Sequence, residues 1–213
     1  MTYLDETYFF DYSHPRIQQY VDDHTSKEDS LQEKSVKLYN AIRDGWRYNP
    51  YQIRFKREEW QSSCIMERPE GHCLDKSILY VSCLRAVGIP ARLHLAKVRN
   101  HIAAEKLMAL LGTDELTPHG MVDLMLDGKW LKASPAFNKS LCDKLNVDTL
   151  EFDGRTDSVF QEFDKEGGLF MEYLEDYGGF EDFPFDFVID NMKAHYSGLT
   201  DDNIPEDGLL EIK

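Results

Sequence analysis

The stretch Gly71–Ser77, GHCLDKS, places a cysteine between a flexible glycine and the first turn of a predicted helix. This helix, over about residues 74–87, is the clearest in the sequence because Gly88 and Pro90 follow it directly. Glycine is favoured just past a helix end, and proline prevents the helix from continuing. The pattern therefore predicts that Cys73 lies at the N-terminal end of a long helix.

The predicted position bears directly on the chemistry of Cys73. A thiol is nucleophilic only as the thiolate, and its ordinary pKa of about 8.5 leaves little thiolate at neutral pH. Unpaired backbone N–H groups and the positive end of the helix dipole stabilise negative charge at a helix N-terminus. Taken alone, a free cysteine there is most often a small buried apolar residue. A nucleophilic role therefore needs a histidine from elsewhere in the chain.

A strand and then a hairpin follow the helix. Residues 89–98, IPARLHLAKV, alternate in the manner of a β-strand. Residues 119–135, HGMVDLMLDGKWLKASP, contain two β-rich runs joined by Asp127-Gly128. This dipeptide suits the left-handed dihedral angles of a type I′ turn, so the sequence predicts a tight hairpin here.

The predicted turn decides which side chains meet across the hairpin. It pairs residues 121 and 134, which places His119 diagonally near Ser134. An imidazole beside a thiol lowers the pKa of the thiol and returns the proton to the leaving group. A polar group on the other ring nitrogen fixes the tautomer. We therefore interpret Cys73 as a nucleophile, His119 as its general base and Ser134 as the group that orients the imidazole.

These residues also carry a family resemblance. The segments GHCLDKSILYVSCLRAVGIPARL and HGMVDLMLDGKWLKASP resemble the transglutaminase-like superfamily from Gly71 to Pro135. The family pattern is a G-x-C helix start, an L-R-x-x-G-I-P-A-R helix end, a histidine on one strand and W-x-x-x-D-P on the next. The resemblance implies a papain-like α+β fold, in which N-terminal helices include a cysteine helix packed against an antiparallel sheet. It places the family's nucleophile on Cys73 and its general base on His119.

The third position departs from the family pattern. Where the family has aspartate before proline, this chain has Ser134. A serine hydroxyl accepts the imidazole N–H but carries no charge, so it stabilises the imidazolium far less and puts turnover in doubt. Asn138 is the alternative third member, since papain-type enzymes use an asparagine.

The resemblance also implies an oxyanion hole beside Cys73. The backbone N–H of Cys73 is the expected first donor to the oxyanion. The sequence does not choose the second donor among three candidates in the connector before the helix: Gln61, Trp60 and Gln52. His72 and Trp130 are expected to form walls of the site.

Charge and composition exclude several classes of function. The chain has 213 residues, with 24 Lys and Arg against 39 Asp and Glu, and a formal net charge of −15. Nucleic acid and anionic membrane surfaces are therefore not expected partners, because phosphate binding needs a basic face. The N-terminus lacks the pattern of a signal peptide, and no window reaches the roughly 18 apolar residues of a spanning helix.

The cysteine and histidine spacings predict no metal site. No C-x-x-C and no pair of histidines four residues apart occurs, and the acidic run EDFPFDFVID lacks the spacing of a calcium loop. We therefore expect no metal and no other cofactor. We also expect a cytoplasmic protein, in which all four cysteines remain thiols: Cys64, Cys73, Cys83 and Cys142.

The sequence predicts one α+β domain over residues 1–213. Its parts are a helical lobe over about 1–90, a β-rich part over about 89–140 and an acidic, aromatic C-terminal segment over about 141–213. We predict irregular structure held by aromatic anchors for the last part, a fraying tail from Ser197, and a short helix inside the β-rich part.

We expect a cysteine-dependent amidase or peptidase, or an acyl transferase, that acts on a peptide or protein amide through a thioester on Cys73. Acyl transfer from a small thioester donor uses the same chemistry. The alternative is a catalytically impaired domain that serves as a binding or scaffold module, and the oligomeric state is left open.

Overall fold

The computed structural model describes residues 2–101, 108, 111–200, 202 and 204–211. Its elements, in chain order, are α1 (Pro15–His24), α2 (Leu31–Gly45), β1 (Arg47–Tyr48), β2 (Gln52–Arg54), the 3₁₀ helix η1 (Arg57–Trp60), α3 (Ser62–Ile65), β3 (Glu70–Gly71), α4 (Cys73–Ala86), β4 (Ala91–Asn100), β5 (Glu115–Leu126), β6 (Lys129–Ala133), α6 (Lys139–Leu145), β7 (Met171–Phe180), α7 (Phe185–His195) and β8 (Leu209–Glu211). The predicted short helix, over residues 103–112, lies largely outside the described residues.

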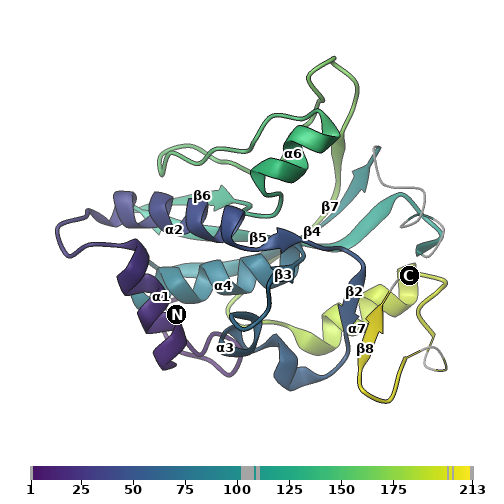
Figure 1. Cartoon of the computed structure of the whole chain (residues 1–213), viewed down its shortest axis with the longest axis horizontal. Coiled ribbons are helices and arrows are strands. Elements are labelled where there is room, and N and C mark those ends of the chain that lie inside the picture. The colour runs from purple at the N-terminus through teal and green to yellow at the C-terminus, as the bar shows by residue number, and fades with distance from the viewer. Residues whose placement is uncertain (1, 102–107, 109–110, 201, 203, 212–213) are drawn as a thin grey trace.

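Helices cover one face of a four-stranded sheet. The sheet has the order β6-β5-β4-β7, and each neighbouring pair is antiparallel. Helices α1 and α2 pack against α4, which in turn lies against β5 (Figure 1). The predicted papain-like α+β architecture, with the cysteine helix on an antiparallel sheet, is confirmed.

The start of α4 is fixed by a capping box. The ring nitrogen Nδ1 of His72 accepts the backbone N–H of Leu74 at 3.2 Å. The Asp75 carboxylate accepts the backbone N–H of His72 at 2.9 Å. These bonds satisfy N–H groups that have no partner inside the helix and set its first residue at Cys73. The helix ends where the sequence predicts, because Gly88 adopts a left-handed φ of 83°.

The hairpin of β5 and β6 has the predicted register. Val122 pairs with Ala133, and Leu126 pairs with Lys129. Asp127 and Gly128 both have positive φ, at 51° and 77°, as a type I′ turn requires. Strand β5 begins four residues before the predicted start, because that extension pairs with the far end of β4.

The C-terminal segment is more regular than the sequence predicts. Strand β7 pairs with residues 93–100 of β4, α7 packs against β5, and β8 pairs with β2. The prediction of irregular structure was therefore wrong over these elements. Most side chains of β7 are exposed or half-buried. An edge strand of this kind lacks the alternation of apolar and polar residues that marks a half-buried strand.

Helix α4 meets β5 most closely at Gly120. A Cβ atom at that position would lie 2.9 Å from Cδ2 of Leu74 and 3.1 Å from both the Leu74 Cα and the Cys73 carbonyl oxygen. Two of these neighbours are backbone atoms, which cannot turn away as a side chain can. The absence of a side chain at Gly120 therefore permits the N-terminal turn of α4 to rest on the sheet.

We expect Gly120→Ala to destabilise the protein by about 1–3 kcal/mol, because the new methyl group overpacks this contact. Urea unfolding would measure the change. Gly45→Ala is the matched control, since its nearest neighbour is the Tyr20 hydroxyl at an ordinary 3.5 Å. Equal effects of the two substitutions would show that the contact at Gly120 is not tight.

Candidate functional site

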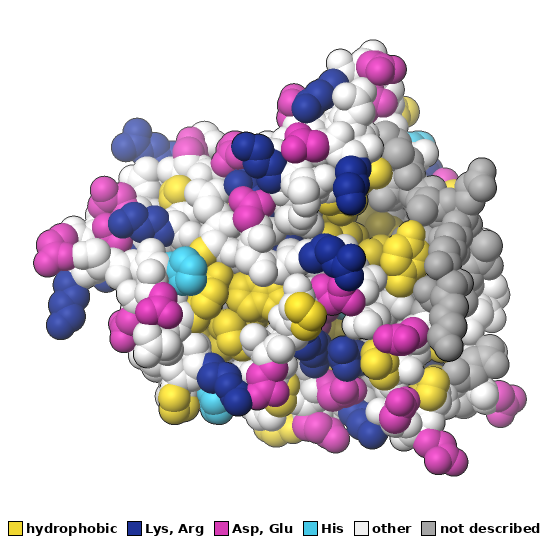
Figure 2. Space-filling view, in the orientation of Figure 1, with side chains coloured by type: hydrophobic (Ala, Val, Ile, Leu, Met, Phe, Trp, Pro, Cys, Tyr) yellow, Lys and Arg dark blue, Asp and Glu magenta, His cyan; other side chains and the backbone are white. Residues whose placement is uncertain are grey.

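Cys73, in the first turn of α4, lies at the edge of a surface cavity. Its side chain is largely buried, with 9% of the residue exposed. The cavity has a volume of about 60 Å³, and apolar residues from five separate parts of the chain surround it, among them Pro50, Ile53, Leu116, Pro118 and Met192. Figure 2 shows apolar side chains gathered above β2, on a face where charged groups are otherwise widely scattered.

Burial holds the Cys73 thiol in its neutral form. Loss of solvent, together with the nearby Asp75 carboxylate, raises the pKa of Cys73 to about 11. Backbone N–H groups of Gly120, Leu74 and Cys73 itself hydrogen-bond toward the sulfur and oppose this effect. The helix N-terminus therefore lowers the pKa as the sequence predicts, but burial outweighs it.

His119 is buried without a hydrogen bond on either ring nitrogen among the described residues. Only 1% of the residue is exposed. Loss of solvent lowers the pKa of His119 to about 4, and the nearby His72 lowers it as well. At neutral pH the site therefore contains a thiol and an uncharged imidazole, rather than a thiolate and an imidazolium.

The structure brings Cys73 beside the backbone of His119, but the two side chains make no hydrogen bond with each other among the described residues. The sulfur faces the N–H of Gly120, the residue that follows His119. A Cβ atom at Gly120 would face α4, whereas His119 lines the second cavity, with Ser134, and not the cavity of Cys73. No hydrogen bond joins the ring to the sulfur in the described part of the chain.

Ser134 lies in the same small cavity as the His119 ring. This second cavity has a volume of about 10 Å³, which is enough for about one water molecule. The side chain of Gln161 also lines it. The structure therefore brings His119 and Ser134 together, as the hairpin register predicts, although their side chains make no hydrogen bond with each other. Gln161 is thus a polar neighbour of His119 and Ser134. It was not predicted from the sequence, because it lies in a loop and no strand pairing indicates its position.

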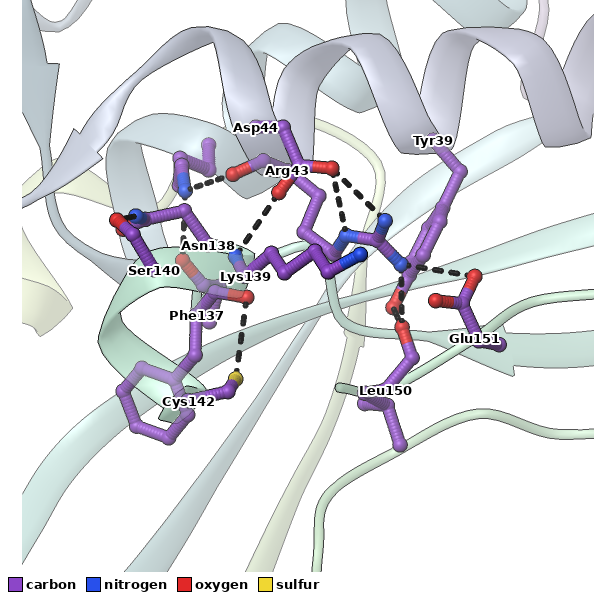
Figure 3. Close-up of polar contacts among 12 residues, drawn as sticks. Tyr39, Arg43, Asp44, Phe137, Asn138, Lys139, Ser140, Cys142, Leu150 and Glu151 are labelled. Carbon is purple, nitrogen blue, oxygen red and sulfur yellow. Dashed lines mark hydrogen bonds and ion pairs between the residues drawn. The ribbon is translucent and has the colours of Figure 1, made fainter. Parts of the chain in front are cut away.

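A buried polar network holds the segment around Ser134 in place. The backbone N–H of Ser134 donates to the Ser158 carbonyl at 2.8 Å, and its carbonyl accepts the Tyr39 hydroxyl at 3.0 Å. The same hydroxyl reaches the carbonyl of Leu150 at 2.9 Å, and the Arg43 guanidinium bonds that carbonyl too (Figure 3). Helix α2 therefore fixes the backbone that carries Ser134.

Asn138 has a structural role in the described structure. Its side-chain oxygen accepts the backbone N–H of Tyr48 at 2.9 Å, and its amide donates to Ser140 at 2.7 Å (Figure 3). Asn138 is the residue before α6 and does not line the cavity of His119. The structure thus places Ser134, and not Asn138, beside the imidazole.

The three expected side-chain donors to an oxyanion bond elsewhere. The Trp60 indole donates to the Arg54 carbonyl at 3.3 Å, and the Gln61 amide donates to the Tyr8 carbonyl at 3.2 Å. The Gln52 amide bonds the Glu211 carboxylate at 2.9 Å. These three side chains do not line the cavity of Cys73. The donors near the sulfur are backbone N–H groups instead.

The two expected wall residues have different positions. His72 lines the cavity of Cys73, and its ring lies 5.7 Å from the Trp60 ring. Trp130 lies toward the turn of the hairpin, opposite Met125, where the Arg92 guanidinium packs on its ring at 4.7 Å. Trp130 lines neither the cavity of Cys73 nor that of His119.

Lys76, a buried cation one turn into α4, was not predicted from the sequence. It is fully buried, and its ammonium group donates to the carbonyls of Arg43 and Ala136 at 2.8 and 2.7 Å. Burial lowers the pKa of Lys76 to about 7, although the Asp44 carboxylate opposes the shift. Lys76 therefore ties α4 to α2 and to the loop after β6.

The described residues hold no group of three or more histidine, cysteine and acidic side chains that is arranged for a metal ion. Within that part of the chain, no helix has both the length and the apolar character needed to cross a membrane.

Comparisons with known proteins agree with this architecture. The model of the transglutaminase-like superfamily matches residues 18–135. A solved structure of a "putative cysteine protease" from Cytophaga hutchinsonii has a similar fold, with a TM-score of 0.52 and 16% sequence identity. The match covers 87% of this chain and 48% of that protein, so this chain spans about half the length of that protein. A comparison with curated proteins finds no match.

We expect the buried His119 to weaken the protein in acid. Its folded pKa of about 4 lies below the unfolded value of about 6.5, so the unfolded chain binds more protons between these values. Stability therefore falls as the pH drops from about 6.5 to 4. Wild type is expected to lose about 2–4 kcal/mol more than His119→Gln over this interval, measured by urea unfolding. If the free energy of unfolding fell equally with pH in the two proteins, the lowered pKa of His119 would be contradicted.

Proposed function

Because the chain belongs to the transglutaminase-like superfamily, we propose that it is a cysteine-dependent enzyme that acts on an amide carbonyl. Cys73 is the nucleophile and His119 is the general base. One observation carries this proposal: the first turn of α4 holds the Cys73 sulfur at the backbone of the residue next to His119, at the edge of a cavity.

The first half of the reaction forms a thioester. The Cys73 sulfur attacks the carbonyl carbon while His119 takes the thiol proton, and the electron pair of the carbonyl moves to its oxygen. When the tetrahedral intermediate collapses, the C–N bond breaks and the imidazolium gives its proton to the departing amine. The acyl group then remains on Cys73.

The second half regenerates the thiol. A water molecule or an amine attacks the thioester while His119 takes its proton, and the C–S bond breaks as that proton passes to the sulfur. Water gives an amidase or peptidase, and an amine gives an acyl transferase. A small thioester could replace the amide as the acyl donor, with its thiol in place of the departing amine. A peptide or protein amide is the proposed substrate, with hydrolysis as the proposed outcome.

The neutral state of the two groups suits this general-base route. An uncharged imidazole has a free lone pair to accept the thiol proton. No hydrogen bond from a described residue holds the His119 ring in its present orientation, and the proposed reaction requires the ring to turn toward the sulfur. Ser134, in the same cavity, is the proposed partner for the other ring nitrogen. Backbone N–H groups of Cys73 and Gly120 are the proposed donors to the oxyanion.

A binding or scaffold module is the second candidate function. Two observations favour it: Ser134 stands where the family has aspartate, and both nitrogens of His119 lack partners in the described structure. A base with a pKa of about 4 is weak at neutral pH, and a serine hydroxyl adds no charge to strengthen it.

Acetylation by p-nitrophenyl acetate distinguishes the two functions. The enzyme should acetylate Cys73 first, because His119 activates it, although Cys64 is more exposed. Peptide mass spectrometry would locate the acetyl group, and p-nitrophenolate release beyond one equivalent would show turnover. His119→Gln should slow acetylation of Cys73 by about 100-fold or more.

The rate at Cys64 is the internal control, since His119→Gln should leave it unchanged. Preferential acetylation of Cys64, with no effect of His119→Gln on Cys73, would exclude the enzyme and favour the module.

A further inference from the structure

The cavity at Cys73 carries no charge, although the chain as a whole is strongly acidic. Most of the residues around it are aliphatic or proline: Pro50, Ile53, Leu74, Leu116, Pro118 and Met192. No aspartate, glutamate, lysine or arginine lies among its described lining residues. The surface that borders the sulfur is therefore apolar on nearly all sides.

The few polar groups of the lining are uncharged at neutral pH. Burial raises the pKa of both Tyr48 and Tyr196, and it lowers the pKa of His72. The Tyr196 hydroxyl accepts the backbone N–H of Thr117 at 2.6 Å, so its lone pairs are partly used within the fold. A charged group that entered this cavity would lose its hydration and find no counter-ion among the described lining residues.

Helix α7 and the residue after it supply one wall of the cavity, through Met192 and Tyr196. Both residues lie outside the segment 18–135 that the family model matches. Two hydrogen bonds fasten this wall to Thr117, two residues before His119. The Thr117 hydroxyl lies 2.8 Å from the side-chain oxygen of Asn191, and the Tyr196 hydroxyl bonds the Thr117 backbone.

A group in this cavity must lie within a few atoms of the reacting carbonyl, because the cavity borders the sulfur directly. A cavity of about 60 Å³ with a mainly apolar lining suits an aliphatic side chain better than a polar one.

We propose that the acyl group transferred to Cys73 carries an uncharged, apolar side chain that fills this cavity, and that Met192 of α7 limits its size. This inference rests on the proposed function. Helix α7, in the C-terminal segment, would then help to determine which acyl groups react with Cys73.

The test compares three acyl donors of similar shape: the p-nitrophenyl esters of N-acetyl-leucine, N-acetyl-asparagine and N-acetyl-aspartate. We expect kcat/KM for the leucine ester to exceed that for the aspartate ester by at least 100-fold, with the asparagine ester between them. Mass spectrometry of each reaction would confirm that the acyl group is on Cys73.

Two variants of Met192 test the role of α7. Met192→Phe should reduce the cavity and lower the ratio of kcat/KM for the leucine ester to kcat/KM for the N-acetyl-glycine ester at least tenfold. Met192→Leu, of similar volume, is the matched control and should keep the wild-type preference. An unchanged leucine-to-glycine ratio in Met192→Phe would overturn the role of α7.

The outcomes separate this inference from the proposed function. Acylation of Cys73 at equal rates by the leucine and aspartate esters would overturn the apolar specificity alone. Acylation of Cys73 by none of the esters, including the glycine ester, would overturn the proposed function and this inference with it.

Discussion

The close contact between the first turn of α4 and β5 at Gly120 is the constraint on which the site depends. Any side chain at this position would meet backbone atoms of α4, so the helix reaches the sheet only because the residue is glycine. This contact sets the Cys73 sulfur against the strand that carries His119. The capping box of His72 and Asp75 then fixes the residue at which the helix begins.

Burial controls the electrostatics of the site. It raises the pKa of Cys73 and lowers that of His119, and it outweighs the N–H groups at the helix start. Cys73 and His119 therefore form no ion pair with each other, and the proposed chemistry starts from two neutral groups. The same burial surrounds the sulfur with apolar side chains, so the environment that weakens the nucleophile also favours an apolar substrate.

The sequence was sufficient for the local elements of this site. Gly88 predicted the end of α4, and Asp127-Gly128 predicted the turn, the register and the approach of Ser134 to His119. It was not sufficient for features set by distant contacts. The engagement of Gln61 with Tyr8 depends on tertiary packing, as does the wall that α7 builds beside Cys73. No short-range pattern reports such contacts.

NMR of the His119 ring before and after S-methylthiolation of Cys73, in a Cys64→Ser background, tests most directly whether the two residues act as a pair. We expect an uncharged ring down to about pH 4, and a change in both its ¹⁵N shifts and its titration midpoint when the sulfur is modified. A ring that titrates near its ordinary pKa of about 6.5, with shifts that ignore the modification, would contradict the account.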